Sequence, residues 1–234
     1  MRNRLVSALG GAARIARSAG LARALNVGVR VADAGFAAVG RAPIGVEVEG
    51  ASIRGYLRHR SFLAEAARPR TTYAQLFLET LTPGATVVDG GAHVGLFTVL
   101  AAAHGAHVVA FEPDPYNLLA LRLNAAGLPN VRLVEKALTD RVGTTTFHVT
   151  PSTIGSSVVE RAGARAQVVE TSSIDAELAG RAIEALIVKL NIEGSELQAL
   201  EGARETLERV EQVAIFVEVN PPLLSAGGRE SVDV

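Results

Sequence analysis

The chain has 234 residues, of which 48% are hydrophobic and 20% charged, and its formal net charge is −1 at pH 7. This composition excludes a disordered chain and fits one ordinary domain with an extension. Because the sequence contains no cysteine, disulfides, thiolate metal ligands and a catalytic thiol are excluded, which is compatible with a cytoplasmic protein.

Positive charge is concentrated in the first part of the chain. Residues 1–70 carry a balance of +8, whereas the remainder carries −9. Leu5, Leu9 and Ile15 recur at roughly helical spacing among arginines, so residues 1–45 are expected to form a basic, helical extension. Three interpretations of the extension stay open: packing on the acidic part, as in a homo-oligomer; docking to an anionic membrane surface or a partner; and phosphate binding.

No membrane-spanning helix or secretory signal is predicted in this extension. Its longest uncharged run, residues 5–13, is less than half the roughly 20 residues that a spanning helix needs. Arg14 and Arg17 interrupt the apolar region too early for a signal peptide. We therefore expect a cytoplasmic protein whose membrane contact is at most peripheral.

Residues 46–234 are expected to form one domain. A small hairpin over residues 45–57 and a helix over 61–80 precede a core over 83–222, in which strand and helix signals alternate. This alternation indicates an α/β, doubly wound and mostly parallel sheet, with a polar loop at 151–157 placed to close over a site. The expected strands are 86–89, 107–112, 131–137, 144–149, 186–192 and 213–219, and the expected core helices are 95–104, 116–126 and 196–209.

The clearest motif is a strand that runs through Asp89 into a glycine turn, followed by a second strand that ends on Glu112. This is the layout of a nucleotide-binding βαβ unit, but the turn lacks the G-x-G-x-x-G pattern of dinucleotide sites. The Asp89 carboxylate would repel a pyrophosphate and suits S-adenosylmethionine (SAM), which carries an ammonium and a sulfonium. Glu112 would accept hydrogen bonds from the ribose. The alternative is that the glycines only permit a tight turn and that Asp89 caps the helix.

A second polar group follows from the expected strand at 186–192. Lys189, Asn191 and Glu193 are spaced by two and would share one face of that strand, and Glu218 ends the next strand. Buried polar side chains are costly unless water, a ligand or one another satisfies them. For an acceptor hydroxyl the candidate bases are Glu193, which is preferred, His93 and Glu218. The alternative is a buried Lys189–Glu193 ion pair that fixes the strand end.

With these motifs placed, the chain resembles the FkbM family of SAM-dependent methyltransferases over residues 46–222. The matching segments are 83–89, 91–98, 110–115, 137–140 and 189–196. The resemblance implies a Rossmann-like class I methyltransferase fold and O-methylation of a hydroxyl on a sugar or polyketide-like metabolite, with no nucleic-acid partner. From their positions at the strand ends, Lys189, Glu193 and Glu218 are the expected catalytic residues. The implied cofactor-binding residues are Asp89, Gly91, His93 and Gly95 near the methionine end, Glu112 at the ribose, and Ala137 and Asp140 near the adenine.

Two departures from the family pattern affect the interpretation. Asn191 stands where the family usually has Asp, so no metal site is predicted. The sequence after residue 219 has no apolar pattern for further strands, so the sheet is expected to be shortened there and the strand at 213–219 to be an edge. An inactive SAM-binding module that acts as a partner subunit is therefore the main alternative, and an NAD-dependent oxidoreductase is a more distant one.

Overall fold

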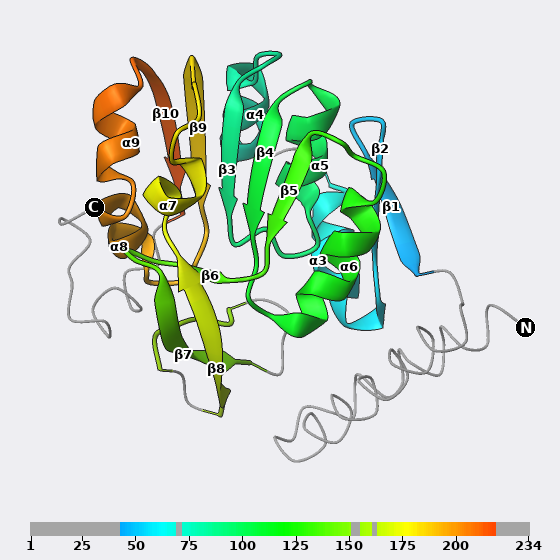
Figure 1. Ribbon diagram of the computed structural model, residues 1–234. Helices are drawn as coiled ribbons and strands as arrows, with labels where there is room; N and C mark the ends of the chain where they lie inside the picture. Colours follow the sequence, from blue (N-terminus) through cyan, green and yellow to red (C-terminus); the bar gives the residue numbers. More distant parts are fainter. Residues whose placement is uncertain (1–42, 69–71, 151–154, 161–162, 219–234) are drawn as a thin grey trace, which may run out of the picture.

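The computed structural model describes residues 43–68, 72–150, 155–160 and 163–218. Its centre is a five-stranded, fully parallel sheet with helices on both faces (Figure 1). In spatial order its strands are β10 (Gln212–Val217), β9 (Ala185–Leu190), β3 (Thr86–Gly90), β4 (His107–Phe111) and β5 (Val131–Val134). The predicted doubly wound α/β sheet is confirmed. The direction of winding reverses between β3 and β9, where ligands bind in such sheets.

The central strands are buried on both faces, and alternate side chains serve different layers. Val87 and Val108 pack towards the helices of one layer, whereas Val88 and Val109 pack towards those of the other. The first layer contains α4 (Thr72–Thr80), α5 (Leu96–Ala103) and α6 (Pro115–Ala125), and the second contains α7 (Ile174–Leu178), α8 (Glu196–Glu201) and α9 (Arg204–Arg209). Each buried valine or leucine contributes about 1.5–3 kcal/mol, so this double burial fixes the strand register.

A smaller sheet lies beyond the carboxyl ends of the central strands (Figure 1). It has the order β6 (Ala137–Leu138), β8 (Arg165–Ser172) and β7 (Gly143–Val149), with β7 and β8 antiparallel. The predicted strand at 144–149 is confirmed as β7, whereas β8 and α7 were not predicted. This sheet supplies one wall of the cleft described below.

The N-terminal hairpin is also confirmed. β1 (Ile44–Val48) pairs antiparallel with β2 (Ala51–Gly55), and the 3₁₀ helix η1 (Leu57–His59) leads into α3 (Arg60–Ala66). Ile53 and Leu63 are buried in a small core with residues of α5 and α6, so the hairpin and α3 are anchored beside the main sheet. The hairpin therefore brings η1 and α3 close to the carboxyl end of β4.

Three expected elements are divided in the structure. The helix expected at 61–80 is two helices, α3 and α4, because Pro69 has no backbone N–H and disfavours helical geometry at the residue before it. The helix expected at 196–209 breaks at Gly202, where an added Cβ would lie 2.5 Å from the carbonyl oxygen of Thr139. This close approach leaves no space for a larger residue.

The strand expected at 131–137 is divided between the two sheets. β5 ends at Val134, and β6 begins at Ala137 beside β8. The two charged residues between them pair in opposite directions, Glu135 with Arg122 of α6 and Lys136 with Glu170 of β8. Their side chains remain on the surface, so the chain leaves the main sheet here.

Several predictions fall mostly outside the described residues. Residues 1–42 of the expected extension and residues 219–234, which carry the expectation of a shortened sheet, are not described. β1 begins at Ile44, within the expected extension of residues 1–45. Within the described part of the chain, no helix is long and apolar enough to cross a membrane.

Candidate cofactor and active site

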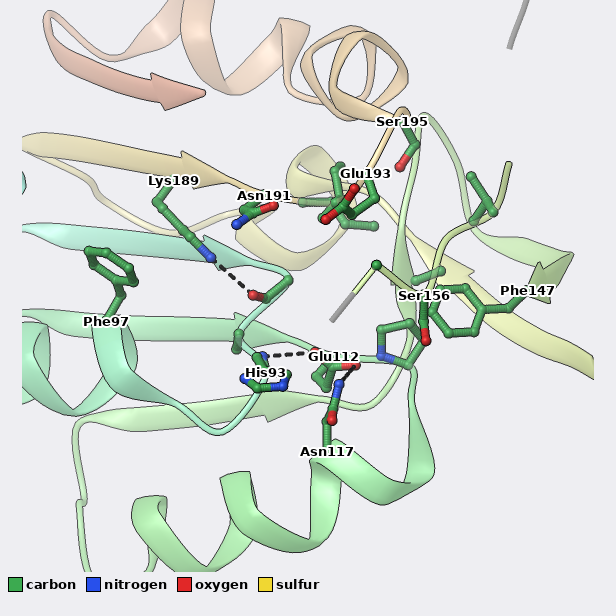
Figure 2. A pocket seen from close by; sticks show the side chains of 18 of the residues that line it. His93, Phe97, Glu112, Asn117, Phe147, Ser156, Lys189, Asn191, Glu193 and Ser195 are labelled. Carbon is green, nitrogen blue, oxygen red and sulfur yellow. Dashed lines mark hydrogen bonds between the residues drawn. The ribbon is translucent and has the colours of Figure 1, made fainter. Parts of the chain in front are cut away.

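A cleft lies at the carboxyl ends of β3, β4 and β9. Its walls come from the loops after these strands, from α3, and from β6 and β7 of the smaller sheet. Figure 2 shows His93, Glu112 and Asn117 on one side and Asn191, Glu193 and Ser195 on the other. A concave site with a few convergent polar groups at the carboxyl ends of parallel strands is where small molecules bind in such folds.

The turn after β3 is shaped by glycine. Gly91 has φ +73° and lines the cleft, and an added Cβ would lie only 2.0 Å from the carbonyl oxygen of Asn191. No other residue fits at this crossing of two loops. Gly95 also has a positive φ, but it begins α5 and faces Leu121 of α6, and it is not among the cleft-lining residues. Gly91 therefore shapes the site, whereas Gly95 shapes the packing behind it.

Asp89 lies beneath the turn and is fully buried. Its carboxylate accepts a hydrogen bond from the Thr98 hydroxyl at 2.6 Å and forms an ion pair with Nζ of Lys189 at 3.0 Å. We expected Asp89 to contact the ligand directly, but in the structure Asp89 does not line the cleft. The alternative, that Asp89 caps the backbone of the helix, also differs from the structure, because its carboxylate accepts a hydrogen bond from the Thr98 side chain of α5.

Lys189 lines the cleft, but its ammonium is directed at the protein. Nζ donates to the carbonyl oxygens of Gly90 and Gly91 at 3.1 and 3.0 Å, in addition to the Asp89 ion pair. These three acceptors match the three donors of an ammonium group. Lys189 pairs with Asp89 and not with Glu193, so the expected Lys189–Glu193 pair is wrong. The lysine holds the glycine turn in place, which differs from the predicted catalytic role.

Glu112 is buried, with 4% of its surface exposed, and lines the cleft. Its carboxylate accepts hydrogen bonds from the backbone N–H groups of His93 at 2.8 Å and Asp114 at 2.9 Å, and from the Asn117 amide at 3.4 Å (Figure 2). Burial, and after it the Asp114 carboxylate, raise the pKa of Glu112 to about 7, although the three hydrogen bonds act in the opposite direction. A carboxylate has about four acceptor positions, so Glu112 retains capacity for a ligand hydroxyl.

Aromatic rings form the wall next to Glu112. The His93 ring lies edge-on to Phe62 at 4.5 Å and to His59 at 5.3 Å, measured between ring centroids. His93 has φ +55°, a left-handed conformation that directs its backbone N–H at Glu112. Both Phe62 and His93 line the cleft, so His93 lies in the cofactor turn as predicted from the sequence.

The opposite wall does not have the predicted strand geometry. β9 ends at Leu190, so Asn191 and Glu193 lie in the following loop and do not share a strand face with Lys189. Glu193 has φ +59°, and the buried Glu196 carboxylate supports this loop by accepting hydrogen bonds from the N–H groups of Ile192 and Gly194. Asn191 and Glu193 nevertheless both line the cleft.

Glu218 lies outside this lining, exposed after the end of β10. Its carboxylate accepts a hydrogen bond from the Asn191 amide at 2.7 Å. Glu218 therefore contacts the site through Asn191, and of the two predicted acidic candidates only Glu193 reaches the cleft.

A short strap, residues 155–158, connects the two walls. The Ser157 hydroxyl donates to the carbonyl oxygen of Glu193 at 2.6 Å, and the Ser156 hydroxyl donates to the Asp114 carboxylate at 3.3 Å. Gly155, Ser156 and Val158 line the cleft. The sequence predicted a loop over the site at residues 151–157, and its described part occupies that place.

The predicted adenine segment is only partly in the cleft. Ala137 and Leu138 line it, whereas Asp140 lines a separate depression and pairs with Arg141 at 2.8 Å. The chain turns away after β6, where the Thr139 N–H binds the carbonyl oxygen of Ser172. Asp140 is thus separated from the cleft by the direction of the chain.

Sequence reasoning missed several lining residues, namely Phe62, Phe97, Asn117 and Phe147. The position of Asn117 in the first turn of the helix after Glu112 was a usable signal, because that turn faces the end of β4. The other three come from separate elements that only the tertiary fold brings together. In the described residues, no group of three or more His, Cys, Asp or Glu side chains is arranged to hold a metal ion.

The chain matches a known protein family. A model of the methyltransferase FkbM domain matches residues 89–233, which is more than half of the chain. The chain belongs to the FkbM methyltransferase family. It is therefore a SAM-dependent methyltransferase by family, with a Rossmann-like class I fold, and the predicted cofactor, SAM, is confirmed. No protein in the curated set of sequences matches the chain.

Several solved structures are similar to this chain at low identity. An rRNA methylase from Streptococcus thermophilus is 21% identical, with 64% of this chain and 71% of that chain covered and a TM-score of 0.37. A TehB-like SAM-dependent methyltransferase from Corynebacterium glutamicum is 14% identical, with coverage of 73% and 78% and a TM-score of 0.39. TYW2 from Pyrococcus horikoshii, in complex with MeSAdo, is 17% identical, with coverage of 47% and 47% and a TM-score of 0.30.

The residues of the cleft fit the family's cofactor. SAM supplies a methyl group activated by a positively charged sulfur. Glu112 offers a carboxylate with spare acceptor capacity, Gly91 has no side chain to block the turn, and Ala137 and Leu138 offer an apolar surface for a base. Glu112 lies on one side of the cleft, and the polar side chains of Asn191 and Glu193 lie on the other (Figure 2).

Proposed function

We propose that this methyltransferase transfers the methyl group of SAM to a hydroxyl oxygen of a sugar or polyketide-like metabolite. The observation that carries the proposal is the division of the cleft. The Glu112 carboxylate lies on one wall, and a carboxylate and an amide, Glu193 and Asn191, lie on the opposite wall. Carboxylates and amides are hydrogen-bond partners suited to hydroxyl groups.

On the cofactor side, the Glu112 carboxylate accepts hydrogen bonds from the ribose hydroxyls, and the backbone N–H of His93 donates to the same carboxylate. Ala137 and Leu138 contact the adenine, and Gly91 lies against the methionine portion. Lys189 and Asp89 act behind the turn and hold its carbonyl groups in position. The cofactor is thus held mainly by backbone and buried groups, which favours alignment of donor and acceptor.

On the acceptor side, Glu193 accepts the proton that the acceptor hydroxyl loses on attack. Glu193 is preferred to Glu218 because Glu193 lines the cleft. Glu218 does not line the cleft and accepts a hydrogen bond from the Asn191 amide. Asn191 is then oriented by Glu218 and binds a second oxygen of the acceptor. The strap at residues 155–158 and the ring of Phe62 limit access of water to this space.

The test is methyl transfer from radiolabelled SAM to a panel of sugars, hydroxylated polyketide-like metabolites and, as a separate arm, rRNA. The proposal expects label on an oxygen of a hydroxylated small molecule or glycan, located by mass spectrometry and NMR. Transfer to rRNA alone, or to a nitrogen or carbon, would contradict it. SAM binding without transfer to any arm would favour the alternative of an inactive module that serves as a partner subunit.

A further inference from the structure

A chain of three buried polar side chains leads from the N-terminal hairpin segment to the cofactor wall. Nδ1 of His59 accepts a hydrogen bond from the Tyr56 N–H at 3.0 Å, and Nε2 of His59 lies 3.3 Å from Oδ1 of Asn117. The Asn117 amide group in turn donates to Glu112 at 3.4 Å (Figure 2). His59, Asn117 and Glu112 are 0%, 3% and 4% exposed.

The direction of each hydrogen bond follows from the first one. Burial lowers the pKa of His59 to about 4, so the imidazole is neutral at pH 7 and carries one hydrogen. Because Nδ1 accepts from a backbone N–H, that hydrogen is on Nε2, which donates to Oδ1 of Asn117. The Asn117 amide is thereby oriented with its NH₂ group towards the Glu112 carboxylate.

The position of the imidazole is itself fixed by the backbone. An added Cβ on Gly55, at the end of β2, would lie 2.9 Å from Cβ of His59 and 3.1 Å from Nδ1. The ring also packs against the Tyr116 ring at 5.0 Å and the His93 ring at 5.3 Å, measured between centroids. Packing alone would be served by an apolar ring, whereas this site also uses both imidazole nitrogens.

We propose that His59 is a positioning residue for the cofactor site, which acts through Asn117 to hold the Glu112 carboxylate in its binding orientation. This inference rests on the proposed role of Glu112 in binding the ribose. It also assigns a function to η1, which precedes residues 89–233, the part of the chain that the family model matches.

The pH dependence of cofactor binding gives a readout that packing alone would not change. The titratable groups near Glu112 are Asp114 at the start of α6, His93 in the turn after β3, and His59 in η1. The ribose hydroxyls donate to the ionised carboxylate, so affinity rises as pH increases through the pKa of Glu112. Loss of the Asn117 donation would raise that pKa further and shift the binding midpoint to higher pH.

The experiment measures binding of S-adenosylhomocysteine (SAH) by calorimetry between pH 6 and 8.5, with melting temperature on each preparation. His59→Phe keeps the ring and removes the donor, and we expect about tenfold weaker binding at pH 7 and a higher midpoint. His59→Gln places an amide donor near Nε2 and should recover most of the affinity. SAH binding by His59→Phe within twofold of wild type, with the same midpoint, would overturn the proposal.

A second variant keeps the test decisive if His59→Phe does not fold. Asn117→Asp preserves size and replaces the NH₂ donor with a carboxylate oxygen, so it should weaken SAH binding and shift the midpoint upward. An unchanged midpoint in Asn117→Asp would also overturn the proposal. Glu112→Gln tests the role of Glu112 in ribose binding separately from the positioning role of His59. If Glu112→Gln binds SAH like wild type, the proposed role of Glu112 itself is wrong. If only Glu112→Gln loses binding, the role of Glu112 stands and the positioning role of His59 is wrong.

Discussion

The two walls of the cleft differ in how their polar groups are held. On the cofactor wall, Glu112 is buried and accepts several hydrogen bonds, and behind that wall the buried Asp89 pairs with Lys189 and accepts a hydrogen bond from Thr98. On the acceptor wall, Asn191 and Glu193 lie in a loop after the end of β9 and are partly exposed. This difference suits a cofactor wall that binds the same ligand, SAM, in every reaction, and an acceptor wall whose loop is less constrained by the surrounding structure.

This difference predicts that turnover depends most strongly on the acceptor wall. Glu193→Gln keeps the shape of the side chain but cannot accept a proton at neutral pH, so turnover should fall about 100- to 10,000-fold. Because Glu193 is not the partner of Lys189, the melting temperature should change little. Glu218→Gln is the matched control, with the same chemical change outside the cleft lining, and it should lose less than about tenfold. Equal losses in the two variants would show that Glu193 is not the base.

The buried wall should govern stability. Lys189→Met leaves the Asp89 charge buried without its cation, which typically costs about 3–5 kcal/mol and lowers the melting temperature by about 6–20 °C. Lys136→Met is the matched control, because Lys136 is the only other lysine in the sequence and pairs with Glu170 on the surface. Its melting temperature should fall by less than about 2 °C. Similar melting of both variants would contradict the structural importance of the buried pair.

The raised pKa of Glu112 predicts how stability changes with pH. The pKa of Glu112 is about 7 in the folded protein against its ordinary value of 4.5, so the folded state binds this proton more tightly than the unfolded chain. The stabilisation from Glu112 is therefore fully present below about pH 4.5 and is lost as pH rises through about 7.

The measurement is urea unfolding of wild type and Glu112→Gln across that range. Relative to the variant, the wild type should lose about 3 kcal/mol of unfolding free energy between about pH 4.5 and 8. A difference that does not change with pH would mean that the pKa of Glu112 is the same in the folded and unfolded states.

The smallest effect is expected from the basic extension. Among the residues that the structure describes, those that line the cleft lie at or after Phe62, and we expect deletion of residues 1–42 to leave SAM affinity within about threefold. Isothermal calorimetry with the shortened chain checks this. A larger loss of affinity would place the extension in the cofactor site. Loss of binding to anionic vesicles, with SAM affinity unchanged, would favour the membrane interpretation.

The sequence predicted the sheet and Glu112 because both depend on local patterns, namely apolar strands and a carboxylate at a strand end. The sequence predicted that Asp89 contacts the ligand, whereas the structure pairs Asp89 with Lys189. This pairing depends on the register between β3 and β9, which no local pattern indicates. The shared-face argument for Glu193 was wrong because β9 ends at Leu190. His59, Phe62 and Phe147 reach the site from distant elements, and no spacing in the sequence indicates this.

The central claim is that the two walls have separate tasks, and calorimetric titration of SAH into Glu112→Gln and Glu193→Gln at pH 7.5 tests it most directly. In Glu112→Gln an amide NH₂ group must face the backbone donors of His93 or Asp114, so SAH binding should weaken by at least about tenfold. Glu193→Gln should bind SAH within about twofold of wild type. Equal affinity in both variants, or loss of binding only in Glu193→Gln, would contradict the account.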